Sequence, residues 1–161
     1  MKALAANQLI TLLKRIPVTK KVFKGICARN IATRPPQKIK SLPSAYIHNT
    51  GYLLEGIHWV LIIYTKHCTL FIDTFGRPPK SVFLEASVKR GFKPVLYNTK
   101  PLQRRGSQVC GHYCIYFLVH LLENWSITEI NRRFTKNHRK NDLLVFNFVK
   151  KLGEKWRVPI M

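Results

Sequence analysis

The apolar residues of the chain form two kinds of pattern. The first kind, a short run rich in β-branched and aromatic residues, predicts strands in the middle of the sequence. Residues 57–65 (IHWVLIIYT) and 68–73 (CTLFID) are rich in β-branched and aromatic residues, as strands are. The two residues between these segments leave room only for a tight turn, so we expect an antiparallel hairpin in which position i faces about position 133 − i. Shorter strands are predicted at 45–49 and 94–98.

Helical spacing dominates the two ends of the sequence. Residues 4–16 carry leucines and isoleucines at helical spacing, and residues 81–90 fit an amphipathic helix that ends at Gly91. From Cys110 to Trp125 the sequence is apolar nearly all round (CGHYCIYFLVHLLENW), which is typical of a buried helix. We expect this helix to be the centre of the fold.

Two further helices are expected after that segment. Ser126 and Glu129 have the spacing of a capping box, which predicts a helix at about 127–134. Another helix is expected over 141–153, with five apolar residues on its core face: Leu143, Leu144, Phe146, Phe148 and Val149. The predicted fold class is α+β, with a small mixed or antiparallel sheet packed on the central buried helix. A length of 161 residues fits one domain, 1–161.

Positive charge is the strongest feature of the composition. The chain has 28 Lys and Arg against 7 Asp and Glu, a formal net charge of +21, and no acidic residue precedes Glu55. The positive charges on such a surface repel one another, so we expect a polyanionic partner. DNA bound without sequence specificity is the first candidate. An anionic membrane surface, an acidic protein and a mitochondrial transit peptide are the alternatives. No apolar run is long enough to span a bilayer, so no transmembrane helix is predicted, and with nucleic acid preferred to a membrane surface we expect no membrane partner.

The four cysteines fit an intracellular protein better than a secreted one. Cys27, Cys68, Cys110 and Cys114 lack both an export signal upstream and the paired CxxC spacing of a zinc site. We therefore expect free thiols in a protein that is not secreted. A metal-binding module that uses Cys110, Cys114, His112 or His58 is a minor alternative.

Cys110 stands where a thiol nucleophile would stand, because it precedes Gly111 and begins the apolar helix. The N-terminus of a helix favours a thiolate, and glycine lets a substrate backbone approach closely. The ordinary alternative for a lone Cys-Gly pair is a buried structural cysteine.

His58 and Asp73 are candidates for activating that thiol. Position 58 of the predicted hairpin faces about position 75, and Asp73 lies close to it at the end of the partner strand. A histidine can accept the thiol proton, and a carboxylate can hold the imidazole in the right tautomer. Considered singly, His58 could be a core histidine and Asp73 a turn residue. With so few acidic residues in the chain, an aspartate at this place favours the functional interpretation.

A glutamine before Cys110 could stabilise an oxyanion. Gln103 precedes the cysteine by a loop that could return its side-chain amide to the reacting carbonyl. Gln108 is closer in sequence and is the competing candidate.

Taken in order, these motifs resemble those of the adenovirus-type maturation proteases, including their relatives in Maverick/Polinton transposons, within the wider class of Ulp1-like SUMO proteases. The likeness covers about residues 22–125 and, more loosely, the C-terminal helices. The motifs that carry it are Gly56-Ile57-His58-Trp59, Phe71-Ile72-Asp73-Thr74-Phe75-Gly76, Gln103 and Val109-Cys110-Gly111, preceded by the strand-like Ala45-Tyr46-Ile47-His48-Asn49-Thr50.

The resemblance implies a papain-like or adenain-like cysteine endopeptidase. Cys110 would be the nucleophile, His58 the general base and acid, and Asp73 the partner of the histidine. Gln103 would be the oxyanion donor beside the Cys110 backbone N–H. Three residues would contact substrate: Gly56, Trp59 and Gly111.

Known properties of the family supply further expectations. Its members cleave after small residues, typically in Gly-Gly-X or Gly-Ala-X sequences. The adenoviral members process capsid precursors in the nucleus or the virion, with DNA and a viral peptide as activators. The adenoviral enzyme bonds that peptide through a cysteine, which the matching stretch 89–96 (KRGFKPVL) lacks. A covalent peptide cofactor is therefore not expected here, and noncovalent activation stays open.

Two other functions remain open from the sequence. The chain could be a protease that removes SUMO or another ubiquitin-like protein from conjugates, because this activity occurs in the same wider class. It could also be a nonenzymatic, basic nucleic-acid-binding domain whose Cys and His belong to the core. We expect that no cofactor is required and that Cys114 is structural. We also expect a monomer, because no apolar stripe is left on the surface once the core is assigned.

Overall fold

The chain divides into two units, one built on a sheet and one built of helices. The structure, a computed structural model, describes residues 1–27, 39, 41–50, 58–89, 91 and 94–160. The sheet unit is Val22–Pro101, and the helical unit combines Met1–Lys21 with Leu102–Met161. The prediction of a single domain over 1–161 stays a prediction.

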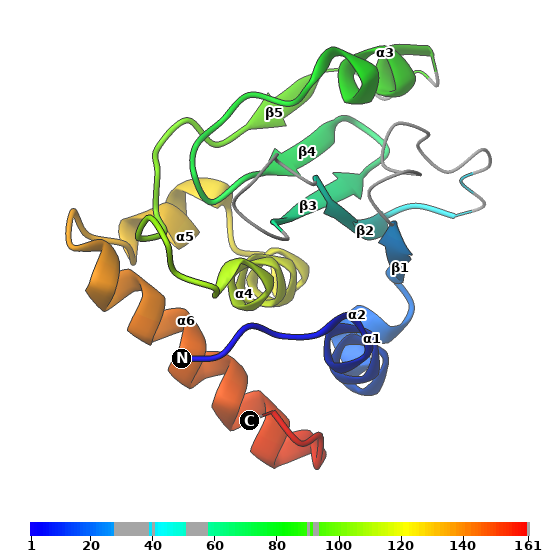
Figure 1. Cartoon of the computed structure of the whole chain (residues 1–161). Coiled ribbons are helices and arrows are strands. Elements are labelled where there is room, and N and C mark those ends of the chain that lie inside the picture. The colour runs from blue at the N-terminus through cyan, green and yellow to red at the C-terminus, as the bar shows by residue number, and fades with distance from the viewer. Residues whose placement is uncertain (28–38, 40, 51–57, 90, 92–93, 161) are drawn as a thin grey trace. The chain divides into compact units, whose positions relative to one another are not determined.

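The sheet unit contains a five-stranded mixed sheet in the order β1-β2-β3-β4-β5, with helix α3 at the β5 end (Figure 1). Strands β2, β3 and β4 are antiparallel, and β1 and β5 each add to the sheet in parallel. The bounds of these elements are β1 Phe23–Cys27, β2 Ser44–Asn49, β3 Trp59–Tyr64, β4 Thr69–Ile72, α3 Ser81–Lys89 and β5 Val95–Tyr97. The predicted mixed sheet is confirmed.

The β3–β4 hairpin has the predicted register. Leu61 pairs with Ile72 and Tyr64 with Thr69, so paired positions sum to the expected value along the whole ladder. Every residue of β3 is buried, on both faces of the strand, which explains its unbroken apolar sequence. One face of the strand contributes to a core cluster: Val60, Ile62 and Tyr64 with Phe71 from β4.

The first strand, β1, was not predicted. Lys24 and Gly25 interrupt the alternation of apolar and polar residues there, and only Phe23 of this strand is fully buried. Its pairing with β2, from Phe23↔Ala45 to Cys27↔His48, is a contact between distant parts of the sequence. Local periodicity carries no signal for such a contact.

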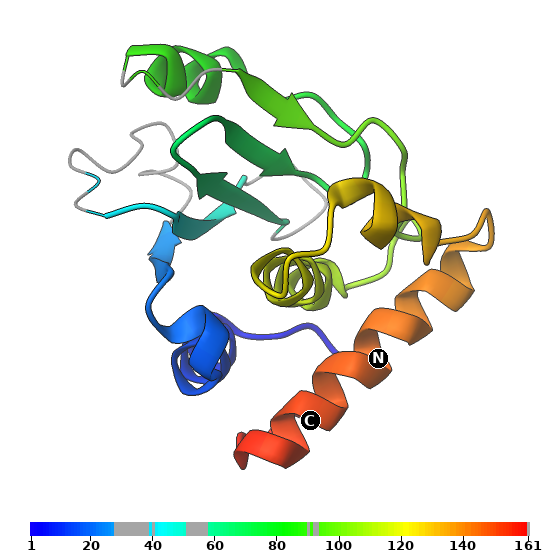
Figure 2. The same ribbon diagram turned by 180° about the vertical axis from the view of Figure 1, so that it is seen from behind.

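The helical unit is arranged around α4, which contacts each of the other helices (Figures 1 and 2). The bounds are α1 Ala6–Arg15, α2 Pro17–Lys20, α4 Cys110–Leu122, α5 Ile127–Arg132 and α6 His138–Trp156. Every residue of α4 from Cys110 to His120 is buried, which confirms the predicted central helix. The capping box also forms: the Glu129 amide donates to Ser126 Oγ, and Glu129 Oε2 accepts from the Ser126 amide.

The core face of α6 differs from the predicted one. Leu143 and Leu144 are exposed, at 50% and 39% of their surface. The buried positions of this helix are Asn141, Asp142, Val145, Val149 and Gly153. The prediction followed the apolar residues, but the helix buries two polar residues that bind a neighbouring turn. Among the described residues, no helix has the length and apolar character needed to cross a bilayer.

Two buried histidines make the fold sensitive to acid. Burial lowers the pKa of His48 to about 4, and burial with the nearby positive N-terminus lowers that of His112 to about 4, against the ordinary 6.5. A histidine with a depressed pKa binds fewer protons in the folded state than in the unfolded state. Its contribution is therefore intact above about pH 6.5 and is lost as the pH falls towards 4.

Acid is expected to lower the free energy of unfolding by roughly 2 to 3 kcal/mol per buried histidine between pH 7 and pH 4.5. Replacement His112→Phe removes one titrating group, and the new ring can still pack on Phe146, whose ring centroid lies 5.3 Å from that of His112. Urea unfolding at both pH values should show a smaller acid loss in His112→Phe. The control is exposed His67→Ala, which should keep the full loss. An equal loss in both variants would contradict the assignment.

Candidate active site

The sheet unit joins His58 to Asp73. His58 directly precedes β3 and Asp73 directly follows β4, so the hairpin register brings them to the same end of the sheet. The His58 Nε2 atom lies 2.8 Å from Asp73 Oδ1, and both side chains are buried. Because Nε2 bonds the carboxylate, Nδ1 is the ring nitrogen that would exchange a proton with a nucleophile.

Four further contacts hold this pair in place. The Phe75 amide donates to Asp73 Oδ1 at 2.9 Å, and the Phe75 ring lies over the imidazole with centroids 4.8 Å apart. The Asn98 side chain, which follows β5, binds the backbone of Asp73 twice. Its Oδ1 accepts from the Asp73 amide at 2.9 Å, and its Nδ2 donates to the Asp73 carbonyl at 2.6 Å. The Asp73 carboxylate is thus oriented through both its side chain and its main chain.

Gly76 lets the chain pass close to the segment after β5. It has a φ of +68°, and a Cβ there would lie 2.6 Å from the Thr99 carbonyl oxygen. Only glycine combines this backbone conformation with so close an approach. The glycine of the Asp73-Thr74-Phe75-Gly76 turn therefore fixes the turn against the same segment that carries Asn98.

Cys110 is the first residue of α4 and is 5% exposed. The first turn of the helix contains no acidic residue, so nothing there opposes the positive end of the helix dipole. At the next position, a Cβ on Gly111 would lie 3.3 Å from Leu9 Cδ2 and 3.5 Å from Leu4 Cβ. Packing against the N-terminal segment is thus one reason for glycine at 111, and its role towards substrate stays a prediction.

Gln103 is buried, and its amide is oriented by its own turn. Its Nε2 atom donates to the Ser107 carbonyl oxygen at 2.7 Å and to Ser107 Oγ at 3.0 Å. The competing candidate, Gln108, is exposed. Burial and fixed orientation favour Gln103, because an oxyanion donor must be held in place before the reaction.

The remaining predicted residues are placed as follows. Trp59 is the first residue of β3 and is buried, whereas Gly56 lies outside the described residues. All four cysteines are free thiols, and Cys114 is buried on α4 one turn after Cys110. Across the described ranges, no group of three or more His, Cys, Asp and Glu side chains is arranged to hold a metal ion.

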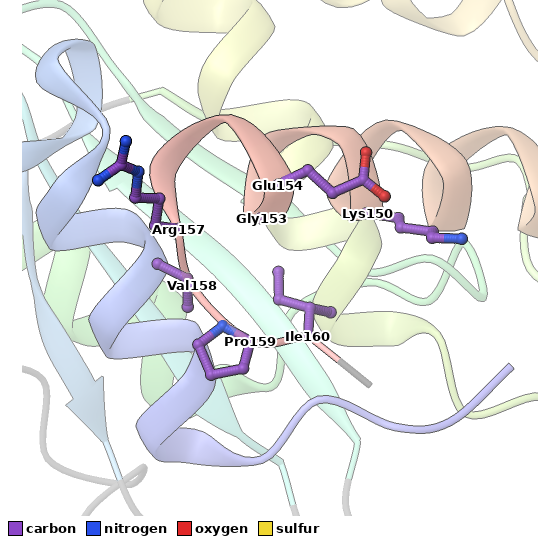
Figure 3. A pocket seen from close by; sticks show the side chains of 7 residues that line it. All are labelled: Lys150, Gly153, Glu154, Arg157, Val158, Pro159 and Ile160. Carbon is purple, nitrogen blue, oxygen red and sulfur yellow. The ribbon is translucent and has the colours of Figure 1, made fainter.

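A hollow of about 390 Å³ lies at the C-terminal end of α6 (Figure 3). The chain turns back there at Arg157, whose φ is +52°, and Ile160 packs on Gly153. Gln8 Nε2 and Arg15 Nη1, both from α1, donate to the carbonyl oxygens of Pro159 and Arg157. The hollow is lined by none of the predicted site residues: its lining is Lys150, Gly153, Glu154, Arg157, Val158, Pro159 and Ile160.

Sequence reasoning missed the residues that orient the site. Asn98 and Phe75 support Asp73, and Ser107 binds Gln103. Phe75 stands inside a motif, so its place was visible in the sequence. Asn98 and Ser107 are ordinary loop residues. The pairing of distant segments brings Asn98 to Asp73, whereas Ser107 lies four residues after Gln103 in the same turn.

The chain shares its fold with solved structures that have the Ulp1-like cysteine protease fold. No protein-family model and no curated protein sequence matches the chain. Among solved structures, ChlaDub1 from Chlamydia trachomatis aligns with a TM-score of 0.67 at 11% identity, over 98% of this chain and 94% of that one. The pS273R protease of ASFV, African swine fever virus, aligns with a TM-score of 0.63 at 13% identity, over 89% of this chain and 66% of the viral chain. The Ulp1-like fold is confirmed, and the closer likeness to adenovirus-type enzymes stays a prediction.

Proposed function

We propose that the protein is a cysteine endopeptidase in which Cys110 is the nucleophile, His58 the general base and Asp73 the group that orients the histidine. The observation that carries the proposal is the buried 2.8 Å bond between His58 Nε2 and Asp73 Oδ1. It supports the proposal because it fixes the tautomer that leaves Nδ1 for the thiol. The start of α4 at Cys110, in a fold shared with cysteine proteases, supports it further.

The proposed reaction is acyl transfer through a thioester. The Cys110 thiol gives its proton to His58 Nδ1, and the thiolate attacks the carbonyl carbon of the scissile bond. The Gln103 amide and the Cys110 backbone N–H would stabilise the resulting oxyanion. The imidazolium then protonates the leaving amine. Water, deprotonated by His58, hydrolyses the thioester and returns the enzyme to its first state.

Alkylation of the four cysteines by iodoacetamide tests this proposal without a known substrate. We expect Cys110 to react at least about tenfold faster than the other cysteines at pH 6, because a histidine that accepts the thiol proton stabilises the reactive thiolate as an ion pair. Mass spectrometry of each cysteine would give the four rates as a function of pH.

Two comparisons within the experiment decide its outcome. Burial raises the pKa of the Cys27 thiol, so Cys27 should label only at high pH and serves as an internal control. In His58→Ala the fast reaction of Cys110 at pH 6 should disappear. If Cys110 follows the same pH profile with and without His58, the proposed pair does not exist.

Substrates with small residues before the scissile bond are proposed on the resemblance to adenovirus-type proteases. In this proposal the protein cleaves Gly-Gly-X or Gly-Ala-X sequences of viral or transposon capsid precursors, in a nucleus or a virion, as a monomer. A protease for ubiquitin-like conjugates is the second candidate, since ChlaDub1, a deubiquitinase, aligns over nearly its whole length. Reaction of Cys110 with ubiquitin or SUMO bearing a C-terminal electrophile, but not with Gly-Ala peptides, would favour the second candidate.

Stimulation by DNA is part of the proposal, and α5 and α6 offer a surface for it. Nine exposed cationic side chains lie between residues 132 and 157: Arg132, Arg133, Lys136, Arg139, Lys140, Lys150, Lys151, Lys155 and Arg157. Only two exposed acidic residues, Glu129 and Glu154, lie in α5 and α6. Lys140 and Lys151 are three helical turns apart on α6, about 16 Å along its axis. Two lysines at this spacing can contact separate phosphates of a DNA backbone.

Charge reversal at these two positions is expected to weaken DNA binding. In Lys140→Glu/Lys151→Glu the slope of log K against log salt concentration should fall by about 2, because each lost phosphate contact removes about 0.9. Fluorescence anisotropy with a short duplex measures this. The control, Lys66→Glu/Lys100→Glu, reverses two exposed lysines of the sheet unit and gives the same net charge. Equal losses in both variants would show that net charge, not this surface, governs binding.

A further inference from the structure

The turn that carries Gln103 is held from both sides by side chains of α4 and α6. On one side, the Leu102 carbonyl oxygen accepts from Tyr113 Oη at 3.0 Å and from Asn141 Nδ2 at 3.1 Å. On the other side, the Arg104 amide donates to Asp142 Oδ1 at 3.4 Å. The two peptide groups that flank Gln103 are thus both bound, which fixes the direction in which its side chain leaves the backbone.

The three side chains that bind the turn form one buried network. Tyr113 Oη also lies 3.0 Å from Asp142 Oδ1, so its single proton is shared between this oxygen and the Leu102 carbonyl oxygen. Asn141 is anchored to the segment before α6, where its Oδ1 accepts from the Thr135 amide and its Nδ2 donates to the Thr135 carbonyl oxygen, each at 2.8 Å. The exposed fractions of Tyr113, Asn141 and Asp142 are 0%, 2% and 0%.

The burial of Asp142 in this network is energetically unfavourable. Its Oδ1 is bound only by neutral donors and its Oδ2 has no hydrogen-bond partner, although the chain carries 28 cationic residues. No cationic side chain of the described residues forms an ion pair with it. A buried carboxylate without a cation is unfavourable for folding, so its retention calls for a role beyond packing. Burial and the negative charge of Asp142 raise the pKa of Tyr113, so the phenol keeps its proton and donates at any working pH.

We propose that Tyr113, Asn141 and Asp142 are positioning residues that act through Gln103, holding its amide ready to bind an oxyanion formed at Cys110. The inference rests on the proposed cysteine protease function. In the absence of substrate, Ser107 accepts both bonds from Gln103 Nε2. In the reaction, the oxyanion would replace the Ser107 hydroxyl at 3.0 Å, while the bond to the Ser107 carbonyl keeps the amide in place. A donor fixed in this way needs no reorganisation when charge develops.

The test uses a ligand that needs the oxyanion donor and a reagent that does not. A peptide aldehyde such as acetyl-Gly-Gly-aldehyde adds reversibly to the cysteine thiol: the S–C bond forms as the C=O π bond opens to an oxyanion, and the thiol proton passes to this oxygen to give the hydroxyl of a hemithioacetal. Iodoacetamide reacts by simple displacement of iodide and forms no oxyanion. Protection of Cys110 from iodoacetamide by increasing aldehyde gives both the alkylation rate and the dissociation constant of the aldehyde in one experiment.

The conservative variant Tyr113→Phe removes only the hydroxyl, which binds both the turn and Asp142. We expect it to raise the aldehyde dissociation constant between about tenfold and a hundredfold, as loss or misplacement of an oxyanion donor does. The alkylation rate and its pH profile should change less than about twofold. Asp142→Ala should act in the same way, and Asp142→Asn should be milder because the amide oxygen still accepts. Tyr116→Phe is the matched control, a buried tyrosine one turn later on α4 that packs on Phe148.

A double-mutant comparison separates positioning from a general structural role. In a Gln103→Ala background, adding Tyr113→Phe should cause no further loss of aldehyde affinity, because the residue that it positions is gone. Full additivity, or an equal fall in alkylation and aldehyde binding, would overturn the inference while leaving the protease intact. If the unaltered protein shows neither fast alkylation of Cys110 nor aldehyde binding, the proposed function fails and the inference falls with it.

Discussion

Replacing Cys110 with alanine is expected to lower the cleavage of a Gly-Gly peptide by about 10⁴-fold or more, because the variant loses the sulfur atom that forms the thioester in the proposed mechanism. The histidine, its carboxylate partner and the glutamine all remain, but none of them can replace the nucleophile. The measurement is kcat/KM on a fluorogenic peptide amide, with the unaltered protein and the variant purified in the same way.

Cys114 provides the matched control for this substitution. It lies one turn later on the same helix, is buried at 1% exposure and forms no disulfide. In Cys114→Ala we expect nearly full activity and a modest loss of stability, about 1 kcal/mol, from the small void that remains. If Cys110→Ala cleaves as fast as Cys114→Ala, the activity belongs to another residue or to a contaminant. The nonenzymatic nucleic-acid-binding interpretation would then come first.

The parts of the site that could be predicted from sequence are those set by local geometry. The hairpin register follows from the position of the turn at Lys66 and His67, and this register alone predicts that Asp73 lies near His58. Cys110 could be placed at a helix N-terminus because the apolar sequence after it leaves no other interpretation. In both cases the relevant residues are close in sequence, or are joined by one tight turn.

The parts that could not be predicted depend on contacts between distant segments. Asn98 reaches Asp73 only because β5 pairs in parallel with β4. The sequence of a three-residue strand does not indicate such a pairing. Asn141 and Asp142 interrupt the expected apolar face of α6, and their function is to bind the turn at Leu102 and Arg104. Exposed Leu143 and Leu144 are the consequence, because a helix that buries polar residues on one face turns adjacent apolar ones outward.

Removal of the Asp73 side chain is the second large effect that we expect. In Asp73→Ala, kcat/KM should fall by about 10³-fold or more, as loss of the orienting carboxylate does in other triads. The carboxylate both holds the imidazole and stabilises the imidazolium that forms when the thiol gives up its proton. Its loss therefore makes the imidazolium, and with it the thiolate–imidazolium pair, less stable. Fast alkylation of Cys110 should shift towards higher pH in the same variant.

Two milder variants separate the contributions of charge and orientation at Asp73. Asp73→Asn keeps an oxygen that can accept from His58 Nε2 but removes the negative charge. Asn98→Ala keeps the charge but removes both bonds to the Asp73 backbone. If charge dominates, Asp73→Asn should lose nearly as much activity as Asp73→Ala, and Asn98→Ala should lose about tenfold, the equivalent of about 1.4 kcal/mol. If orientation dominates, the order of the two variants reverses. Retention of more than about a tenth of the activity in Asp73→Ala would exclude Asp73 from the site, because removing a working orienting carboxylate costs far more.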